Sequence, residues 1–328
     1  MKKSFFLLIA LFISLAAFSN SIENINNSVI DPPDEFETLV NYLEANTNFI
    51  NGELPLIMAN EVKKNMKDSR FHIIDIRSDS WFEYGHIKGA ENVKSADLLT
   101  YFESTINPTD FDKIVLVCYS GQSAAYYSSL LRIAGYDNVY SMKWGMSSWR
   151  EDFANNSWSK NVKNDFAAQL ETTENTKPEK GASPVLNTGK IEAKDILKAR
   201  LEELFATPYK EFIVKSPVVF ENPGNYYIVN YVDQDNYING HIPGAIQYEP
   251  NTSFSTTTDL TTLPADKQVL VYETTGQKAA YVIAYLNVLG YKTGNLAYGQ
   301  NSFMNDVLKD KGWDAFTKKE INMFPVIE

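Results

Sequence analysis

The only cysteine of the chain, Cys118, stands where a predicted strand meets a predicted helix. The aliphatic run over residues 114–117 is typical of a buried parallel strand, and residues 123–134 are typical of a helix. The backbone N–H groups between them can converge on the sulfur, beside the positive end of the helix dipole. This environment favours a thiolate, and therefore nucleophilic chemistry at sulfur. The alternative is an inert cysteine packed as a small hydrophobic residue. The loop residues are Tyr119, Ser120, Gly121 and Gln122.

The N-terminus has the pattern of a secretory signal peptide. Lys2 and Lys3 precede an apolar run over residues 5–18, which is too short to span a bilayer comfortably, and small residues lie near position 19. We therefore predict a signal peptide over residues 1–19 and a periplasmic or secreted protein. An uncleaved membrane anchor is the alternative. After removal of the signal, we expect no contact with a membrane.

The composition excludes several other kinds of site. A single cysteine forms no intramolecular disulfide, CxxC redox couple or cysteine-rich zinc site, and three histidines make a histidine-based metal site improbable. A net charge of −11 argues against nucleic acid as a partner. The sequence implies no metal and no cofactor. A lone thiol in an oxidising compartment needs a functional reason.

An internal repeat organises the chain. Shifting the sequence by 155 positions superposes residues 85–90, Gly-His-Ile-Lys-Gly-Ala, on residues 240–245, Gly-His-Ile-Pro-Gly-Ala. This repeat predicts two copies of one α/β unit, each a mostly parallel sheet flanked by helices. We expect a flexible lead-in over residues 20–33, one domain over 34–165, a linker over 166–190 and a second domain over 191–328.

The two copies differ where chemistry is expected. Cys118 corresponds to Glu273, and the charged strand end of the first copy, Asp75 and Arg77, corresponds to uncharged residues in the second. The second domain is therefore predicted to be non-catalytic. We interpret Glu273 as a carboxylate that is solvated or paired with Lys278. Since the histidines of residues 85–90 and 240–245 recur in both copies, we interpret them as structural hydrogen-bonding residues.

Hydrophobic periodicity predicts the elements around the loop. In the first copy these are helices over residues 34–43, 60–66 and 96–102, strands over 71–77 and 139–142, a short apolar run over 54–57, and a closing helix from Trp144.

Together these motifs resemble the tandem rhodanese family of sulfurtransferases. The similarity includes Asp75-Ile76-Arg77, the Gly-His-Ile-x-Gly-Ala motif at residues 85–90, the Cys-x-x-Gly-x loop at 118–122 and Gly135-Tyr136. The resemblance implies that Cys118 carries a persulfide. It also implies that the backbone amides of residues 119–123 hold the sulfur, so that these residues bind the substrate: Tyr119, Ser120, Gly121, Gln122 and Ser123.

The resemblance implies a small sulfur-donor molecule or a protein persulfide as partner, and leaves the oligomeric state open. Active loops of this family often carry cations where this chain has Tyr119 and Ser123. We therefore expect weak use of thiosulfate and better use of a polysulfide or a protein persulfide. Two other hypotheses remain: a non-catalytic module that binds through the same fold, and a redox-sensing thiol.

Overall fold

The computed structural model describes residues 34–46 and 54–328. The predicted signal peptide (residues 1–19) and lead-in (residues 20–33) lie outside the described residues. We call residues 35–161 the first repeat and residues 193–311 the second repeat. The helices and strands of the first repeat are α1 (Glu35–Asn46), β1 (Leu56–Ile57), α2 (Ala59–Asn65), β2 (Phe71–Asp75), α3 (Asp79–Tyr84), β3 (Glu91–Asn92), α4 (Leu98–Thr100), β4 (Lys113–Val117), α5 (Gln122–Ile133), β5 (Val139–Met142), α6 (Glu151–Asn156) and α7 (Trp158–Asn161).

The second repeat contains the same series with fewer helices. Its elements are α8 (Ala193–Ala206), β6 (Ile213–Val214), α9 (Ser216–Glu221), β7 (Tyr227–Asn230), α10 (Gln234–Ile238), β8 (Ile246–Gln247), β9 (Val269–Tyr272), α11 (Gln277–Val288), β10 (Thr293–Leu296) and α12 (Asn305–Lys311). Helix α11 lies 155 positions after α5 at both ends, as the repeat in the sequence predicts.

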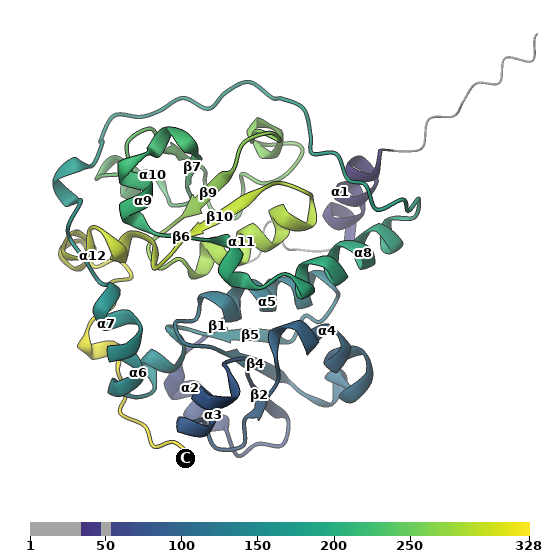
Figure 1. Cartoon of the computed structure of the whole chain (residues 1–328), viewed down its shortest axis with the longest axis vertical. Coiled ribbons are helices and arrows are strands. Elements are labelled where there is room, and N and C mark those ends of the chain that lie inside the picture. Colours follow the sequence, from purple (N-terminus) through teal and green to yellow (C-terminus); the bar gives the residue numbers. More distant parts are fainter. Residues whose placement is uncertain (1–33, 47–53) are drawn as a thin grey trace, which may run out of the picture. The chain divides into compact units, whose positions relative to one another are not determined.

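Each repeat builds one five-stranded parallel sheet. The strand order is β1-β5-β4-β2-β3 in the first and β6-β10-β9-β7-β8 in the second, and neighbouring strands of both described sheets run parallel. Helices flank the sheets (Figure 1). The predicted α/β class with two copies of one unit is confirmed. The central strands β4 and β9 are aliphatic and buried, as parallel strands covered on both faces must be.

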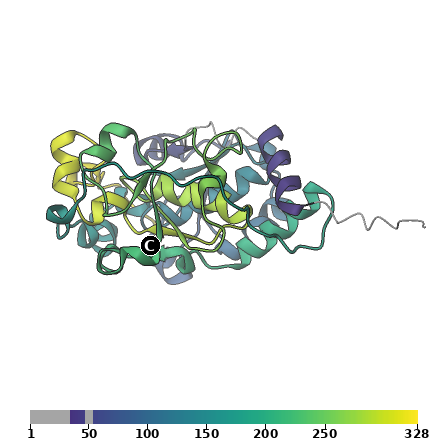
Figure 2. The same cartoon turned by 90° about the horizontal axis from the view of Figure 1, so that it is seen from above.

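One hydrophobic core runs through both repeats. Helices α5 and α11 pack against each other, and the hydroxyl of Ser129 on α5 donates to the carbonyl oxygen of Tyr281 on α11 at 2.8 Å. Helix α1 lies beside α8 in both views (Figure 1 and Figure 2). Four apolar positions of α1 face this core: Phe36, Leu39, Val40 and Leu43. The helix begins after Asp34, whose carboxylate accepts the N–H of Phe36, so the predicted capped helix is confirmed.

The segment that follows each repeat in the sequence forms a β-bridge with the other repeat, so the two segments are exchanged. After the first repeat, Glu171 forms a two-bond antiparallel bridge with His241 of the second repeat. After the second repeat, Ile327 forms the same bridge with His86 of the first. The glycine before each histidine leaves room for the exchanged segment. A Cβ atom on Gly85 would lie 2.8 Å from a methyl carbon of Val326, and the equivalent glycine of the second repeat faces Leu170.

The segment that connects the two repeats packs along the surface of the second repeat. It contains no helix or strand from residue 172 to residue 192, and Figure 1 shows it as a long strand-free connection. The ammonium group of Lys177 pairs with Asp259 at 2.9 Å, and the N–H of Gly181 donates to the carbonyl oxygen of Thr261 at 2.7 Å.

The closing helix of the first repeat differs from the sequence expectation. It does not begin at Trp144, which has a left-handed backbone with φ of 65°. A short 3₁₀ turn over Gly145–Ser148 follows, and α6 begins only at Glu151. The reason is tertiary, because residues 145–147 support the Cys118 loop instead of continuing a helix.

Candidate active site

The sulfur of Cys118 lies at the carboxyl end of β4, held by two backbone amides. The N–H groups of Gly121 and Ala124 donate to Sγ at 3.1 and 3.4 Å. Gly121 has φ of 87°, a left-handed conformation that turns the loop tightly into α5. Cys118 is only 1% exposed, so these two amide contacts are shielded from water. N–H groups that point at sulfur from the start of a helix stabilise a thiolate or a persulfide anion.

The loop amides can face the sulfur because the loop carbonyls are held elsewhere. The carbonyl oxygen of Cys118 accepts the N–H of Met146 at 2.9 Å. The next two carbonyls accept the hydroxyl of Ser147 and the indole N–H of Trp158, each at 3.0 Å. A Cβ atom on Gly145 would lie 2.5 Å from the Cys118 carbonyl oxygen, so this close approach requires glycine. The segment after β5 therefore fixes the orientation of the loop.

Two tyrosines of the second repeat, Tyr209 and Tyr298, lie beside the Cys118 loop, where they line the same pocket as its residues. Burial raises the pKa of the Tyr209 hydroxyl well above its usual range, and the charge of Cys118 raises it further. Burial and then the Cys118 charge act in the same direction on the pKa of Tyr298. Both tyrosines line the same pocket as the loop residues Tyr119 and Ser120, and their raised pKa values keep the phenols in the neutral form. The second repeat thus supplies part of the wall of the pocket beside the Cys118 loop.

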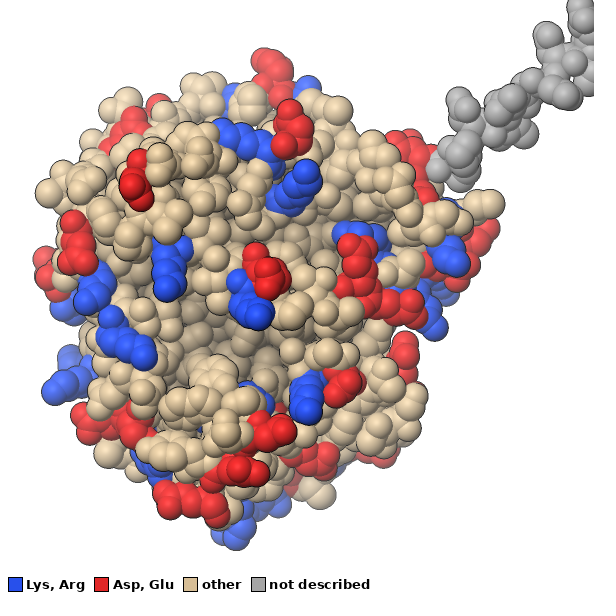
Figure 3. All heavy atoms as spheres, in the orientation of Figure 1, with Lys and Arg blue, Asp and Glu red and all other residues tan. Residues whose placement is uncertain are grey.

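A cavity of about 760 Å³ opens beside the Cys118 loop. Its walls come from the loop, from the segment after α6 and from the second repeat. Three exposed lysines, Lys163, Lys210 and Lys215, line it together with one acidic residue, Asp165. None of the three lysines forms an ion pair with a residue that the structure describes. Figure 3 shows basic side chains, with acidic ones beside some of them, around a hollow near the middle of one face. In a protein of net charge −11, this cavity is locally suited to an anionic ligand.

The five residues assigned to substrate binding from the sequence take different positions. Tyr119, Ser120, Gln122 and Ser123 line the cavity, whereas Gly121 contributes its N–H to the sulfur. The Tyr119 ring turns away toward α3. Its hydroxyl accepts the N–H of Ser78 at 3.3 Å, and its ring meets Trp81 edge to face at 5.7 Å. Sequence reasoning missed Ala124, the two tyrosines and the three lysines.

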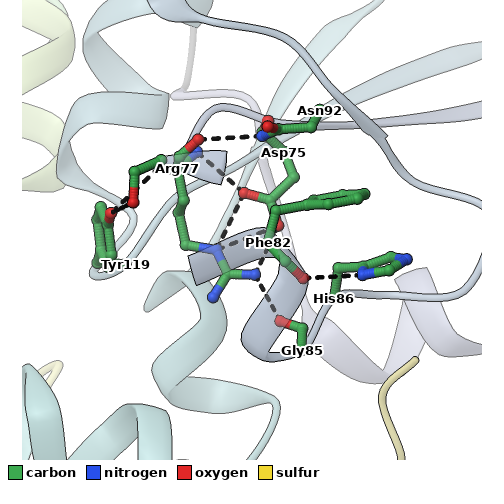
Figure 4. A network of polar contacts seen from close by, with 8 residues as sticks. Asp75, Arg77, Phe82, Gly85, His86, Asn92 and Tyr119 are labelled. Atoms are coloured by element: carbon green, nitrogen blue, oxygen red, sulfur yellow. Dashed lines mark hydrogen bonds and ion pairs between the residues drawn. The ribbon is translucent and has the colours of Figure 1, made fainter. Parts of the chain in front are cut away.

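Arg77 forms a structural ion pair with Asp75 at the end of β2 (Figure 4). Both side chains of the pair are completely buried. The guanidinium Nε and Nη2 atoms contact the Asp75 carboxylate at 3.0 and 2.7 Å, and Nη2 also donates to the carbonyl oxygen of Gly85 at 2.7 Å. This pair ties β2 to the glycine-histidine turn. In that turn, His86 Nδ1 lies 2.9 Å from the carbonyl oxygen of Phe82. His241 has the same contact with Tyr237, so both histidines are hydrogen-bonded to backbone, as predicted.

Glu273 is neither solvated nor paired with the ammonium group of Lys278, so this sequence interpretation is wrong. Its side chain is 4% exposed, and its carboxylate accepts the N–H groups of Thr275 and Lys278 at 2.7 and 3.1 Å. Two threonine hydroxyls complete the shell, from Thr274 at 2.9 Å and Thr275 at 3.0 Å. The second loop therefore uses its own amides to hold a carboxylate. The contact with Lys278 is through the backbone.

The fold and the loop define a class of protein: two parallel α/β units, one of which ends a central strand in a cysteine held by backbone amides. The family model for the rhodanese-like domain matches the chain twice, over residues 58–152 and 221–306, which is more than half of it. The chain belongs to the rhodanese-like family, with two such domains.

Relatives of this family include a curated enzyme and solved structures. The chain is 33% identical over 96 residues to the thiosulfate sulfurtransferase GlpE of Shewanella oneidensis, which covers 29% of this chain and 91% of that protein. A rhodanese-related protein of Thermoplasma volcanium is 22% identical, with 29% of this chain and 90% of that chain covered and a TM-score of 0.26. A rhodanese-like domain protein of Staphylococcus aureus is 21% identical, with 28% and 88% covered and a TM-score of 0.26.

Proposed function

We propose that the protein is an exported sulfurtransferase that carries sulfane sulfur as a persulfide on Cys118. The observation that carries this proposal is the contact of Sγ with the N–H groups of Gly121 and Ala124 beside an anion-compatible cavity. The similarity to a thiosulfate sulfurtransferase supports the same class of reaction. The second repeat, in which Glu273 stands at the position of the cysteine, forms no persulfide.

The reaction has two steps. The Cys118 thiolate attacks the outer sulfur of the donor, the sulfur–sulfur bond of the donor breaks, and the remainder of the donor leaves with the electron pair. With thiosulfate the leaving group is sulfite, and with a polysulfide it is the shortened polysulfide. An acceptor nucleophile then attacks the outer sulfur of the persulfide and releases the Cys118 thiolate. The two loop amides stabilise the anion that sulfur carries before and after each transfer.

We propose a donor larger than thiosulfate, either a polysulfide or a protein persulfide. Tyr119 and Ser123 supply no positive charge beside the sulfur, Arg77 is buried in its ion pair, and Lys143 is paired with Asp314 at 2.7 Å. A charged hydrogen bond contributes about 1.5–3 kcal/mol, so the missing loop cations disfavour a compact dianion. A cavity of about 760 Å³ lies in the size range of sites for much larger ligands.

Export rests on Lys2, Lys3 and the apolar run over residues 5–18. We propose a periplasmic or secreted location on this basis. Within residues 34–46 and 54–328, no helix is long and apolar enough to cross a membrane.

Intact mass spectrometry tests the function. The protein is incubated separately with thiosulfate, polysulfide and peroxide, and transfer to cyanide or a thiol acceptor is then measured. We expect the mass of one added sulfur atom with polysulfide, less with thiosulfate, and none in Cys118→Ser. Glu273→Ala should retain most of the turnover. Oxygen added by peroxide, with no sulfur added by either donor, would favour a redox-sensing thiol and refute the proposal.

A further inference from the structure

The cysteine-free loop of the second repeat contacts the Cys118 loop through one buried glutamine. Gln277, the first residue of α11, is completely buried, and its Oε1 accepts the N–H of Trp144 at 2.7 Å. The same oxygen packs on the backbone of Gly121, where a Cβ atom would lie 1.9 Å from it. A side chain of the inert loop therefore rests directly against the residue whose N–H donates to Sγ.

The contact also reaches the carbonyl side of the active loop. Trp144 precedes the turn in which Met146 donates to the carbonyl oxygen of Cys118. Its φ of 65° is unfavourable for a bulky residue and persists only where the surroundings hold it. The hydrogen bond to Gln277 is a buried contact that holds the Trp144 backbone in this conformation. One side chain thus supports both the segment that orients the loop carbonyls and the amide that faces the sulfur.

The equivalent contact also runs from the first repeat to the second. Gln122 lies at the equivalent position of the first repeat, and its Oε1 accepts the N–H of Tyr298 at 2.9 Å. Tyr298 has φ of 63°, and a Cβ atom on Gly276 would lie 2.7 Å from the same oxygen. Each loop therefore holds the other. The second loop has no cysteine, yet it keeps the glycine and glutamine that make this contact.

We propose that Gln277 is a positioning residue for Cys118, and that the second repeat acts on the reaction through it. When the Trp144 N–H is bound and Gly121 is packed, the two loop amides point at Sγ and stabilise the sulfur anion. When the contact is lost, the loop is held less firmly and the anion is less stabilised. Only the measurement of persulfide formation depends on the proposed sulfurtransferase function, because thiolate formation can be measured without any donor.

Two substitutions in the full chain remove the contact in different ways. Gln277→Met keeps the volume and removes the acceptor, and Gln277→Asn keeps an amide that is too short to reach Trp144. The Nε2 atom of Gln277 has no hydrogen-bond partner in the described part of the chain, so neither change breaks a second bond. Gln300→Met is the matched control. Gln300 is a completely buried glutamine of the same repeat, and its amide donates to Asn236 at 2.7 Å.

Thiolate formation is followed by ultraviolet absorbance against pH, as the difference from Cys118→Ser. Persulfide formation with polysulfide is followed by mass spectrometry. In both Gln277 variants we expect the thiolate titration to move to higher pH and persulfide formation to slow by up to about tenfold, because the two loop amides are then held less firmly at Sγ. Gln300→Met should match the wild type in both measurements.

Two results would overturn the inference, and a third would overturn only the proposed function. Folded Gln277 variants with the wild-type titration and rate would overturn it. A shift of the same size in Gln300→Met would also overturn it, because the effect would then come from general loss of packing. If the wild type forms no persulfide with any donor, the proposed function fails, while the titration still decides whether Gln277 positions Cys118.

Discussion

Arg77 is paired with Asp75 in the core, so we predict that its positive charge stabilises the fold and does not bind substrate. Both side chains are completely buried, and the guanidinium donates to both carboxylate oxygens and to the carbonyl oxygen of Gly85. Replacing Arg77 with valine leaves the Asp75 carboxylate buried without its partner, which costs about 3–5 kcal/mol of unfolding free energy. For a protein of this size, the melting temperature should fall by roughly 10 °C.

The second repeat provides the control for this change. It carries Asn230 and Val232 at the two positions, so the double variant Asp75→Asn with Arg77→Val imports a pair that the fold already tolerates. Removing both charges avoids the uncompensated carboxylate, so the double variant should recover most of the loss and lie within about 2 kcal/mol of the wild type. Thermal unfolding and sulfur transfer are measured on the same samples. If the double variant is stable but loses transfer from anionic donors, Arg77 binds substrate and the structural interpretation is wrong.

Two further predictions concern buried polar groups. Asn230 is completely buried and neither of its amide atoms has a hydrogen-bond partner among residues 34–46 and 54–328, so Asn230→Leu should raise the unfolding free energy by about 1–3 kcal/mol. Asn236→Leu, which removes the acceptor of Gln300, should lower it, and equal effects of the two changes in denaturant unfolding would contradict the argument. Burial lowers the pKa of His72 in the folded protein. As the pH falls through about 6.5, the unfolded chain therefore binds more protons than the folded protein. The free energy of unfolding should thus fall as the pH drops from about 7.5 to 5.5. His72→Phe, which keeps the ring stacked 4.7 Å from Phe111, should flatten this dependence, and an unchanged slope would contradict it.

The sequence could predict the local frame of the site, because that frame depends on neighbouring residues. The aliphatic run before Cys118 makes a buried strand, Gly121 permits the turn, and the following residues make the helix whose amides meet the sulfur. The repeat at 155 positions then predicts a second unit with the same sheet order. Each of these features follows from periodicity, glycine conformation or self-similarity, which are readable in one chain.

The cavity walls could not be predicted in the same way. Lys163 follows α7, and Lys210 and Lys215 flank β6. The cavity therefore brings together residues that are about fifty positions apart in the sequence and that lie far from Cys118 in the sequence. No periodic pattern marks them. Trp144 is a second case, because a bulky aromatic residue does not indicate a left-handed backbone. Its conformation depends on an acceptor, Gln277, that lies 133 positions later in the chain.

The error at Glu273 also supports the chemistry proposed for Cys118. The sequence interpretation of Glu273, solvated or paired with Lys278, overlooks the amides of its own loop as partners for the carboxylate. In the structure those amides, with two threonine hydroxyls, hold the negative charge at a position that is 4% exposed. The two loops share their helix start, their left-handed glycine and their glutamine. The second loop is therefore occupied by the carboxylate of Glu273, whereas in the first the same backbone surrounds the thiol of Cys118. A loop that can bury a carboxylate is well suited to stabilise a persulfide anion, and this division of roles follows from one residue, cysteine or glutamate, at the end of the strand.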